Sequence, residues 1–300
     1  MKILITGGGG FIGAWIARGL LEAGHSIRIF DLVDQRRIMR LILGAEVAGE
    51  VDWWTGDIAD TAAVEQAAAD CDGIVHLAGL LTPACQADPL KGLRVNLTGT
   101  LNVFLAARNL GINRIIYMSS AGVFGPDGSG QPRPVTHYGS FKLACEHSAA
   151  AFWYDDGVAS TGFRPFVVYG PGREGGLSAG PTLACQAAVQ GEAYTIPFTG
   201  RFDMIHVEDV ASAFIAALSQ APAGARVFNL PGVVASSDDV VAAVLRNVPE
   251  ARIDAAGPPL PIVCPAPDGK ALAALPGWSP RDLHTGISDT VAFYRQQAQG

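Results

Sequence analysis

A phenol and an ammonium stand four residues apart in this sequence, in the segment Tyr138-Gly-Ser-Phe-Lys142. Residues at positions i and i+4 of a helix lie on one face, so this spacing brings the two side chains together. A tyrosine is a poor acid or base at neutral pH, and a neighbouring ammonium favours its phenolate form. The pair is therefore a candidate acid–base couple, although half-buried surface helices show the same spacing.

Two adjacent serines, Ser119 and Ser120, follow the apolar run at residues 115–118. The run predicts a buried strand, and doubly wound sheets bind their ligands at the carboxyl ends of their strands. Serines at strand ends also form turns. Combined with Tyr138 and Lys142, their position favours a catalytic role for a serine hydroxyl.

A glycine-rich segment, Thr6-Gly7-Gly8-Gly9-Gly10-Phe11-Ile12-Gly13, lies between a predicted strand and a predicted helix. Its glycines fit two dinucleotide-binding patterns, GxGxxG from position 8 and GxxGxxG from position 7. In both, Gly10 lets backbone N–H groups approach a pyrophosphate, and Gly13 allows the helix to pack closely on the strand. A flexible turn would have the same composition, so the motif needs support from elsewhere in the chain.

Asp31 gives that support, because it closes the second predicted strand at the position where a carboxylate accepts the ribose hydroxyls of a dinucleotide. A 2′-phosphate would meet this negative charge, so NAD is favoured over NADP. Arg36 and Arg37 follow closely and leave NADP as an alternative.

These residues require a scaffold of alternating strands and helices. Apolar runs at residues 3–5, 27–30, 51–54, 74–77, 115–118 and 161–168 alternate with helix-length segments at 11–23, 61–69, 90–109 and 138–152. This order predicts βαβ units and an α/β fold, a doubly wound parallel sheet of the Rossmann type.

The pattern changes at the turn-rich segment after Tyr169. We expect a dinucleotide-binding domain over residues 1–165, with part of 204–230 returning to it. Residues 166–300 are expected to form mainly a smaller, substrate-binding lobe, with helices near 178–190 and 208–218.

Composition narrows the possible partners. Hydrophobic residues make up 49% of the 300 residues and charged residues 16%, below the usual ~25%, which indicates a globular protein rich in core. The net charge of −7 argues against nucleic acid and against an anionic membrane. No metal site is expected, because the cysteines lack metal-ligand spacing. Dispersed thiols and the absence of a signal peptide or membrane span predict a cytoplasmic protein. The five cysteines are Cys71, Cys85, Cys145, Cys185 and Cys264.

Further motifs occur in a fixed order along residues 1 to about 215. They are Gly56-Asp57-Ile58, His76-Leu-Ala-Gly79, Val95-Asn96-Leu-Thr-Gly-Thr-Leu-Asn, Met118-Ser-Ser-Ala-Gly-Val-Phe-Gly125 and Arg164-Pro-Phe-Val-Val-Tyr-Gly-Pro-Gly. With the glycine segment, Asp31 and YxxxK, this set resembles the extended short-chain dehydrogenase/reductases, the NAD-dependent epimerase/dehydratase family.

The resemblance implies a role for each matching residue. It makes Tyr138 the acid–base, Ser120 the hydroxyl that hydrogen-bonds the reacting oxygen, and Lys142 the ammonium that tunes the phenol and binds the ribose. The implied NAD-binding residues are Gly7, Gly10, Phe11, Ile12 and Gly13 at the pyrophosphate, Asp31 at the ribose, Asp57 and Ile58 at the adenine, Leu77, Ala78 and Gly79 along the cofactor edge, and Asn96 and Phe166 near the nicotinamide, besides Tyr138 and Lys142. For Asn96 a structural role at a helix kink stays open, and His76 and His206 are expected to be structural.

Departures from the family pattern bear on the reaction. Sugar 4,6-dehydratases of this family carry Asp-Glu after the catalytic hydroxyl, where this chain has Ala121-Gly122, so dehydration is not expected. Its nucleotide-sugar epimerases usually read Arg-Tyr-Phe-Asn where this chain reads Arg164-Pro-Phe-Val167, and a valine cannot hydrogen-bond a substrate.

We therefore expect an NAD-dependent dehydrogenase that moves a hydride between nicotinamide and a secondary alcohol or ketone of a small polyhydroxylated metabolite: a sugar, sugar acid or hydroxy acid. Arg173 is a candidate for a substrate carboxylate, or else a surface arginine, and Thr82 and Ser178 are candidates for substrate hydroxyls, beside Ser120 and Tyr138. A sugar or nucleotide-sugar epimerase is the alternative. A regulator that binds NAD without catalysis is a third reading.

The family resemblance also implies a homodimer, since its helices corresponding to residues 90–109 and 138–152 pair between subunits. Phe141, Cys145 and Ala149 are the apolar positions that we expect to be exposed there.

Overall fold

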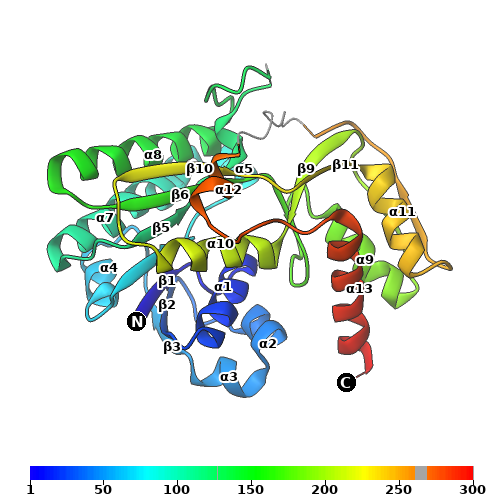
Figure 1. Cartoon of the computed structure of the whole chain (residues 1–300), viewed down its shortest axis with the longest axis horizontal. Helices are drawn as coiled ribbons and strands as arrows, with labels where there is room; N and C mark the ends of the chain where they lie inside the picture. The colour runs from blue at the N-terminus through cyan, green and yellow to red at the C-terminus, as the bar shows by residue number, and fades with distance from the viewer. Residues whose placement is uncertain (127, 261–268, 300) are drawn as a thin grey trace.

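The computed structural model of the chain describes residues 1–126, 128–260 and 269–299. A parallel seven-stranded sheet in the order β10-β6-β5-β4-β1-β2-β3 forms the centre of the larger lobe (Figure 1). The order reverses between β1 and β4, so the predicted doubly wound Rossmann sheet is confirmed. The strands are β1 (Lys2–Thr6), β2 (Ser26–Asp31), β3 (Asp52–Thr55), β4 (Gly73–His76), β5 (Ile115–Met118), β6 (Ser160–Pro165) and β10 (Ala225–Leu230).

Helices cover both faces of this sheet, and side chains that alternate along each strand reach both layers. In β1, Ile3 and Ile5 belong to the core cluster shared with α1 and α10, whereas Leu4 packs with α4, α7 and α8. Both faces are apolar, which is why the strands read as uninterrupted apolar runs. The helices are α1 (Phe11–Glu22), α4 (Thr61–Ala68), α7 (Gly99–Leu110), α8 (His137–Asp156) and α10 (Val207–Ser219).

Two elements that the sequence predicts as continuous are each divided in the structure. The helix expected at residues 90–109 consists of α6 (Pro89–Leu93), a π-helical turn η1 (Arg94–Thr98) and α7. The strand expected at 161–168 ends at Pro165 with β6, and β7 (Val167–Tyr169) pairs with another sheet. The patterns also gave no signal for three short helices, α2 (Arg37–Leu43), α3 (Ala45–Glu50) and α5 (Thr82–Ala87).

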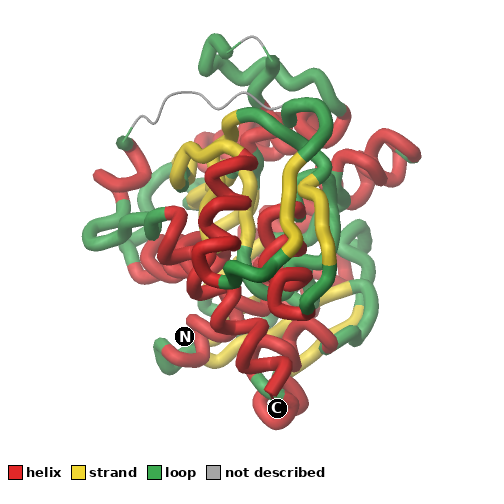
Figure 2. Tube along the Cα trace, turned by 90° about the vertical axis from the view of Figure 1, so that its right-hand side faces the viewer, coloured by secondary structure: helices red, strands yellow, loops and turns green. Residues whose placement is uncertain are grey.

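A smaller lobe stands beside the carboxyl end of the large sheet, and Figure 2 looks onto it. Its core joins β7, β9 and β11 to α9, α11 and α13. Between β9 and β11 the chain returns to the large lobe, where α10 packs against α1 and β10 pairs with β6. The elements are α9 (Gly180–Gln190), β8 (Ala193–Ile196), β9 (Arg201–His206), β11 (Val233–Ser236), α11 (Ser237–Asn247), β12 (Arg252–Ala255), α12 (Lys270–Ala274) and α13 (Leu283–Gln299).

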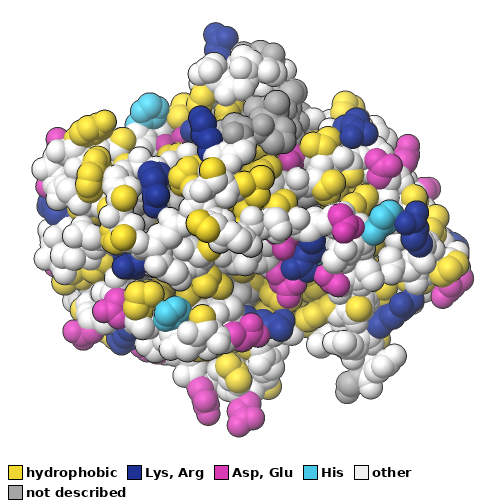
Figure 3. Space-filling view, viewed as in Figure 1, with side chains coloured by type: hydrophobic (Ala, Val, Ile, Leu, Met, Phe, Trp, Pro, Cys, Tyr) yellow, Lys and Arg dark blue, Asp and Glu magenta, His cyan; other side chains and the backbone are white. Residues whose placement is uncertain are grey.

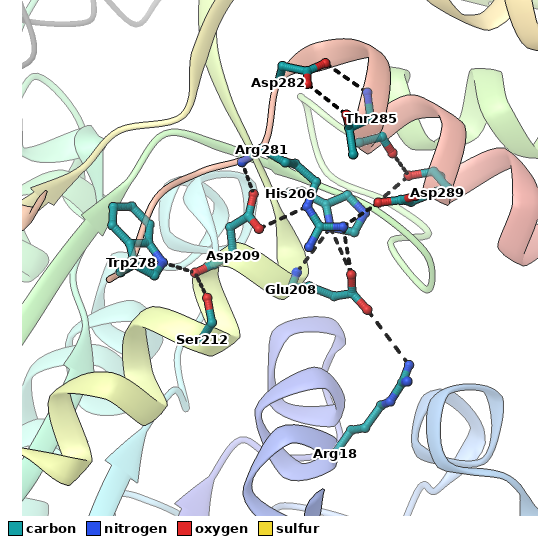
Figure 4. A network of polar contacts seen from close by, with 12 residues as sticks. Arg18, His206, Glu208, Asp209, Ser212, Trp278, Arg281, Asp282, Thr285 and Asp289 are labelled. Carbon is teal, nitrogen blue, oxygen red and sulfur yellow. Dashed lines mark hydrogen bonds and ion pairs between the residues drawn. The ribbon is translucent and has the colours of Figure 1, made fainter. Parts of the chain in front are cut away.

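A polar network fastens the C-terminal segment to α10 and α1 (Figure 4). Arg281 donates to Asp209 Oδ1 at 3.0 Å, Glu208 Oε2 at 2.8 Å and Asp289 Oδ2 at 2.7 Å. Arg18 of α1 reaches the other oxygen of Glu208 at 3.9 Å. Arg281 thus connects the start of α10 to α13.

One prediction about side-chain exposure on α8 is wrong. Cys145 and Ala149, expected to be exposed, are only 2% and 1% exposed. Cys145 contacts the carbonyl of Asn96 and the hydroxyl of Thr100, and Ala149 belongs to the core cluster beneath the sheet. The large apolar side chains that this helix exposes are Trp153 and Tyr154. On the face drawn in Figure 3, basic and acidic side chains are interspersed.

Cys71, Cys85, Cys145 and Cys185 are free and buried, and Cys264 lies outside the described residues. Within residues 1–126, 128–260 and 269–299, no group of three or more His, Cys, Asp or Glu side chains could hold a metal ion. The helices in those ranges are too short or too polar for any of them to cross a bilayer.

Candidate active site

The glycine segment forms a tight turn from β1 into α1. Gly7 has φ +69°, and a Cβ there would lie 2.6 Å from the backbone N of Ala78, so only glycine fits. A Cβ on Gly13 would lie 2.7 Å from Gly8 Cα, as expected for helix-to-strand packing. Gly10 is exposed at the start of α1, and no side chain caps that helix. The free N–H groups of its first turn therefore fit an anionic diphosphate.

Asp31 lies at the end of β2 beside this turn. Its carboxylate accepts from Gly9 N at 3.0 Å and from Leu32 N at 2.8 Å, and the residue is half-buried. The Trp53 ring is close, since a Cβ on Gly9 would meet both that ring and Asp31 Oδ2. The carboxylate retains free acceptor positions for hydroxyl groups.

The two nearby arginines already have partners. Arg36 lies 5.0 Å from the Trp53 ring centroid, pairs with Asp34 and donates to the carbonyls of Ala48 and Gly49. Arg37 pairs with Glu174 of the smaller lobe. Neither guanidinium is free to receive a 2′-phosphate, which favours NAD over NADP.

Other predicted cofactor residues differ in exposure. Phe11, Ile12, Leu77, Ala78 and Phe166 are half-buried, and Gly79 and Asp57 are exposed. Ile58 is 6% exposed, since it packs beneath Gly99. The turn and the uncapped α1 terminus follow β1, Asp31 ends β2, Leu77 and Ala78 follow β4, and Phe166 follows β6. These groups stand at the carboxyl edge of the sheet and fit a bound dinucleotide.

Asn96 takes the structural role that the sequence left open. It is 0% exposed in the π-helical turn, where its Nδ2 donates to the carbonyls of Leu80 and Gly92 and its Oδ1 accepts from Leu80 N. Asn96 thereby fixes the backbone beside Gly79, and a Cβ on Gly79 would lie 3.6 Å from Lys142 Nζ.

Tyr138, Lys142 and Ser120 converge next to this backbone. Thr136 caps α8 by accepting from Gly139 N at 3.0 Å, and Gly139 packs against the carbonyl of Gly122. This contact brings the two partners together: a Cβ on Gly122 would lie 3.3 Å from Ser120 Oγ and 3.4 Å from the Tyr138 ring. Ser120 Oγ and the edge of the Tyr138 ring thus flank the same point beside Gly122.

Lys142 completes the group. Its Nζ lies 5.9 Å from the Tyr138 ring centroid and donates to the carbonyl of Met118 at 2.7 Å, with the residue 5% exposed. The ammonium is thus held by the end of β5, near the phenol. Such a group can donate a hydrogen bond and transfer a proton at a secondary alcohol.

Ser119 and Ser120 have different roles. Ser120 is half-buried and accepts from Gly122 N at 3.0 Å, whereas Ser119 is 1% exposed and donates to Glu146. Glu146 in turn pairs with Arg164 of β6, with Arg164 Nε 2.7 Å from Oε1. The sequence motifs did not indicate this buried pair; its only signal was that Glu146 follows Lys142 by four residues.

His76 and His206 are core residues, as expected. His76 lies between Thr6 Oγ1 at 2.7 Å and Thr100 Oγ1 at 2.9 Å, and burial lowers its pKa to about 3. His206 caps α10 by accepting from Glu208 N, and burial lowers its pKa to about 3 as well.

Of the five predicted substrate residues, Arg173 and Ser178 contact each other. Arg173 donates to Ser178 Oγ at 2.9 Å and to the carbonyl of Val168, and burial lowers its pKa to about 10. Its guanidinium is therefore already hydrogen-bonded to groups of the protein. Thr82 is half-buried at the start of α5, and Leu81 beside it is close to Gly176 of the Arg173 loop.

The chain is 29% identical to a UDP-glucose 4-epimerase of Corynebacterium glutamicum, over 98% of this chain and 95% of that one. It is 30% identical to a 2-alkyl-3-oxoalkanoate reductase of Stenotrophomonas maltophilia, over 85% of this chain and 78% of that one. The structure of a Thermus thermophilus UDP-glucose 4-epimerase in complex with NAD superposes with a TM-score of 0.82 at 26% identity, over 98% and 99% of the two chains.

The model of the NAD dependent epimerase/dehydratase family matches residues 3–230, which include the glycine turn, Asp31 and the Ser120, Tyr138 and Lys142 group. The chain therefore belongs to the NAD-dependent epimerase/dehydratase family, and NAD is its cofactor.

Proposed function

We propose that this protein is an NAD-dependent dehydrogenase that oxidises a secondary alcohol of a small polyhydroxylated metabolite, or reduces the corresponding ketone. The observation that carries the proposal is the convergence of Ser120 Oγ and the Tyr138 ring on one point beside Gly122, with the Lys142 ammonium behind the phenol.

The side chains would share the work as follows. Tyr138 takes the proton of the substrate hydroxyl and returns it in the reverse direction. Ser120 hydrogen-bonds the same oxygen and fixes its position. Lys142, anchored on the Met118 carbonyl, stabilises the phenolate by its charge.

The cofactor would lie along the glycine turn. The first turn of α1 binds its diphosphate, Asp31 accepts its adenosine ribose hydroxyls, and Gly79 and Phe166 border its reactive end. NAD, when bound, accepts or returns the hydride.

The choice of substrate rests on the smaller lobe. Val167 is 3% exposed within β7, so the position where nucleotide-sugar epimerases carry an asparagine offers neither a hydrogen bond nor access. The Arg173 fork is bonded to Val168 and Ser178. Both observations favour a substrate smaller than a nucleotide sugar.

A sugar or nucleotide-sugar epimerase is the second candidate. Epimerisation at a secondary alcohol uses the same hydride exchange, and the Corynebacterium glutamicum and Thermus thermophilus proteins are both named UDP-glucose 4-epimerase. The Stenotrophomonas maltophilia protein, at similar identity, is named a reductase, and a reductase catalyses a net reduction rather than an epimerisation.

One experiment separates the two candidates. The purified chain is mixed with NAD and a panel of sugars, sugar acids and hydroxy acids, and NADH is followed at 340 nm; UDP-glucose and UDP-galactose are tested in parallel for interconversion. Net NADH supports the dehydrogenase. Interconverted sugars without net NADH support the epimerase, and neither product from a chain that binds NAD supports the non-catalytic regulator.

We also propose a homodimer that pairs through α8 and the adjoining α6 and α7. Leu90, Trp153 and Tyr154 are exposed at 73%, 38% and 84% on these helices, and a partner subunit would cover them. Light scattering should give twice the chain mass, and Tyr154→Glu combined with Leu90→Glu should halve it. A monomeric wild type would disprove this assembly.

A further inference from the structure

Glu146 is a buried acid that the mechanism above does not use. It follows Tyr138 and Lys142 at intervals of one helical turn on α8, and it is 6% exposed. Burying a carboxylate to this extent costs free energy that a neighbouring cation offsets. Arg164 supplies that cation, with Nε 2.7 Å from Oε1 and a further nitrogen on Oε2.

Glu146 and Lys142 hold adjacent residues at the carboxyl end of β5. Lys142 Nζ binds the carbonyl of Met118, and the hydroxyl of Ser119 donates to Glu146. Ser120 is the next residue along the chain. A cation and an anion from one helix therefore fix the backbone that presents the catalytic serine.

The other titratable groups packed around Lys142 are held neutral at pH 7. Burial lowers the pKa of His76 on β4 to about 3 and raises the pKa of the Cys145 thiol on α8. It also raises the pKa of the Cys85 thiol on α5, and that of Tyr117 on β5 well above its usual value.

His137, next to Tyr138 on α8, is exposed and stacks on Phe141, and Arg133 before that helix is exposed as well. The charges that the described residues place at this site are thus those of the buried Lys142 and Glu146 and of the half-buried Arg164.

We propose that Arg164 and Glu146 are positioning residues that set both the charge and the geometry of the Tyr138–Lys142 couple. Arg164 neutralises Glu146, so the Lys142 ammonium acts on the phenol at full strength. Glu146 holds Ser119 and thereby orients Ser120. The inference rests on the proposed function, in which Tyr138 exchanges a proton with substrate.

The test follows the ionisation of one phenol without substrate. As the pH is raised, the absorbance at 295 nm increases when a tyrosine ionises. The component of this increase that is missing in Tyr138→Phe reports the Tyr138 phenolate. Arg164→Met leaves the Glu146 charge opposing Lys142 and should move the midpoint of this change up by about one pH unit. Glu146→Gln leaves the Arg164 charge unmatched and should move it down by a similar amount.

The double variant, Glu146→Gln with Arg164→Met, removes both charges, so its midpoint should return close to that of the wild type. The pH profile of kcat/KM should follow the same order. Arg164→Lys keeps the charge and should keep the midpoint, but it loses the paired bonds that hold Glu146 and should lower kcat.

Arg226 is a matched control on the neighbouring strand β10. It is half-buried and lies 5.8 Å from the Phe228 ring, much as Arg164 lies 5.2 Å from the Phe124 ring. It pairs with Thr161, three residues and about 10 Å before Arg164 along β6. Arg226→Met should leave the midpoint unchanged.

Shifts in the same direction in both single variants, or no shift in folded protein, would overturn the proposal. If Arg164→Met does not fold, the direction of the Glu146→Gln shift still decides. Because the absorbance needs no substrate, failure of the proposed function would appear separately, as a wild type that yields neither NADH nor an epimer.

Discussion

Tyr138 depends on neighbours from three elements: Lys142 on its own helix, Ser120 after β5, and the Gly122 turn that brings them together. Tyr138→Phe removes only the hydroxyl and keeps the ring contacts. We expect kcat to fall by about 10² to 10⁴, the usual contribution of a general acid–base group. Affinity for NAD, measured by calorimetry, should stay within about twofold, since the ring still packs on the turn.

Tyr154→Phe is the matched control for this substitution, because Tyr154 lies on the same helix and is 84% exposed. Its turnover should equal that of the wild type. Unchanged turnover in Tyr138→Phe itself would contradict proton transfer by this phenol.

Asp31 offers a second prediction for a single residue. Asp31→Ser removes a charged acceptor next to Gly9 N, and NAD affinity should fall about tenfold or more, as for the loss of a charge-assisted hydrogen bond. NADP should remain a poor cofactor, because Arg36 stays bonded to Asp34, Ala48 and Gly49. Calorimetric titration with each nucleotide tests this; tight NADP binding would show that Arg36 leaves its partners readily.

At the scale of elements, Arg281 connects the start of α10 to α13 (Figure 4). Arg281→Met leaves Glu208, Asp209 and Asp289 without their shared cation, with Asp209 only 6% exposed. We expect the free energy of unfolding to fall by about 2 kcal/mol, less than for a fully buried pair because Arg281 retains some exposure. Urea denaturation measures this loss.

Arg18 is the control for Arg281, since it approaches Glu208 only to 3.9 Å and both side chains are exposed by about a third. Arg18→Met should cost less than about 0.5 kcal/mol. Equal losses in the two variants would mean that Arg281 does not carry the connection between the helices.

The divided elements show what local sequence can predict. Six of the seven strands of the large sheet coincide with the apolar runs, and β1, β2, β4, β5 and β6 among them are buried on both faces. The seventh, β10, was not predicted as a strand of this sheet. The π-helical turn within 90–109 was not predicted either, since its cause is tertiary: Asn96 bonds to Leu80, sixteen residues earlier in the chain. Likewise, the break after Pro165 follows from the pairing of β7 with β9, a partner far along the sequence.

At the scale of the whole molecule, the site also combines features that local sequence predicts with features that only tertiary contacts create. Glycines, Asp31, Ser120, Tyr138 and Lys142 carry their chemistry in residue type and spacing, and the structure brings them to one edge of the sheet. The Glu146–Arg164 pair joins α8 to β6, and the Trp53 ring reaches Asp31 from β3. Such contacts arise only once strands distant in sequence are neighbours in the sheet.

The free energy of unfolding of the whole molecule also depends on pH in the acid range. His76 in the large sheet and His206 at the start of α10 both have pKa values lowered to about 3 by burial, from the ordinary value of 6.5. The unfolded chain therefore binds protons below pH 6.5 that the folded chain does not. Stability from these groups is complete above pH 6.5 and is lost as pH falls toward 3, by about 1.4 kcal/mol per pH unit for each histidine.

His206→Asn keeps a side chain that can cap α10 and removes one of these titrations. Between pH 6 and pH 4, its free energy of unfolding should fall less steeply than that of the wild type, by about 1.4 kcal/mol per pH unit. Urea denaturation at several pH values measures both slopes. His284→Asn, at an exposed position on α13, should leave the slope unchanged. Parallel slopes for His206→Asn and the wild type would mean that His206 is protonated in the folded molecule.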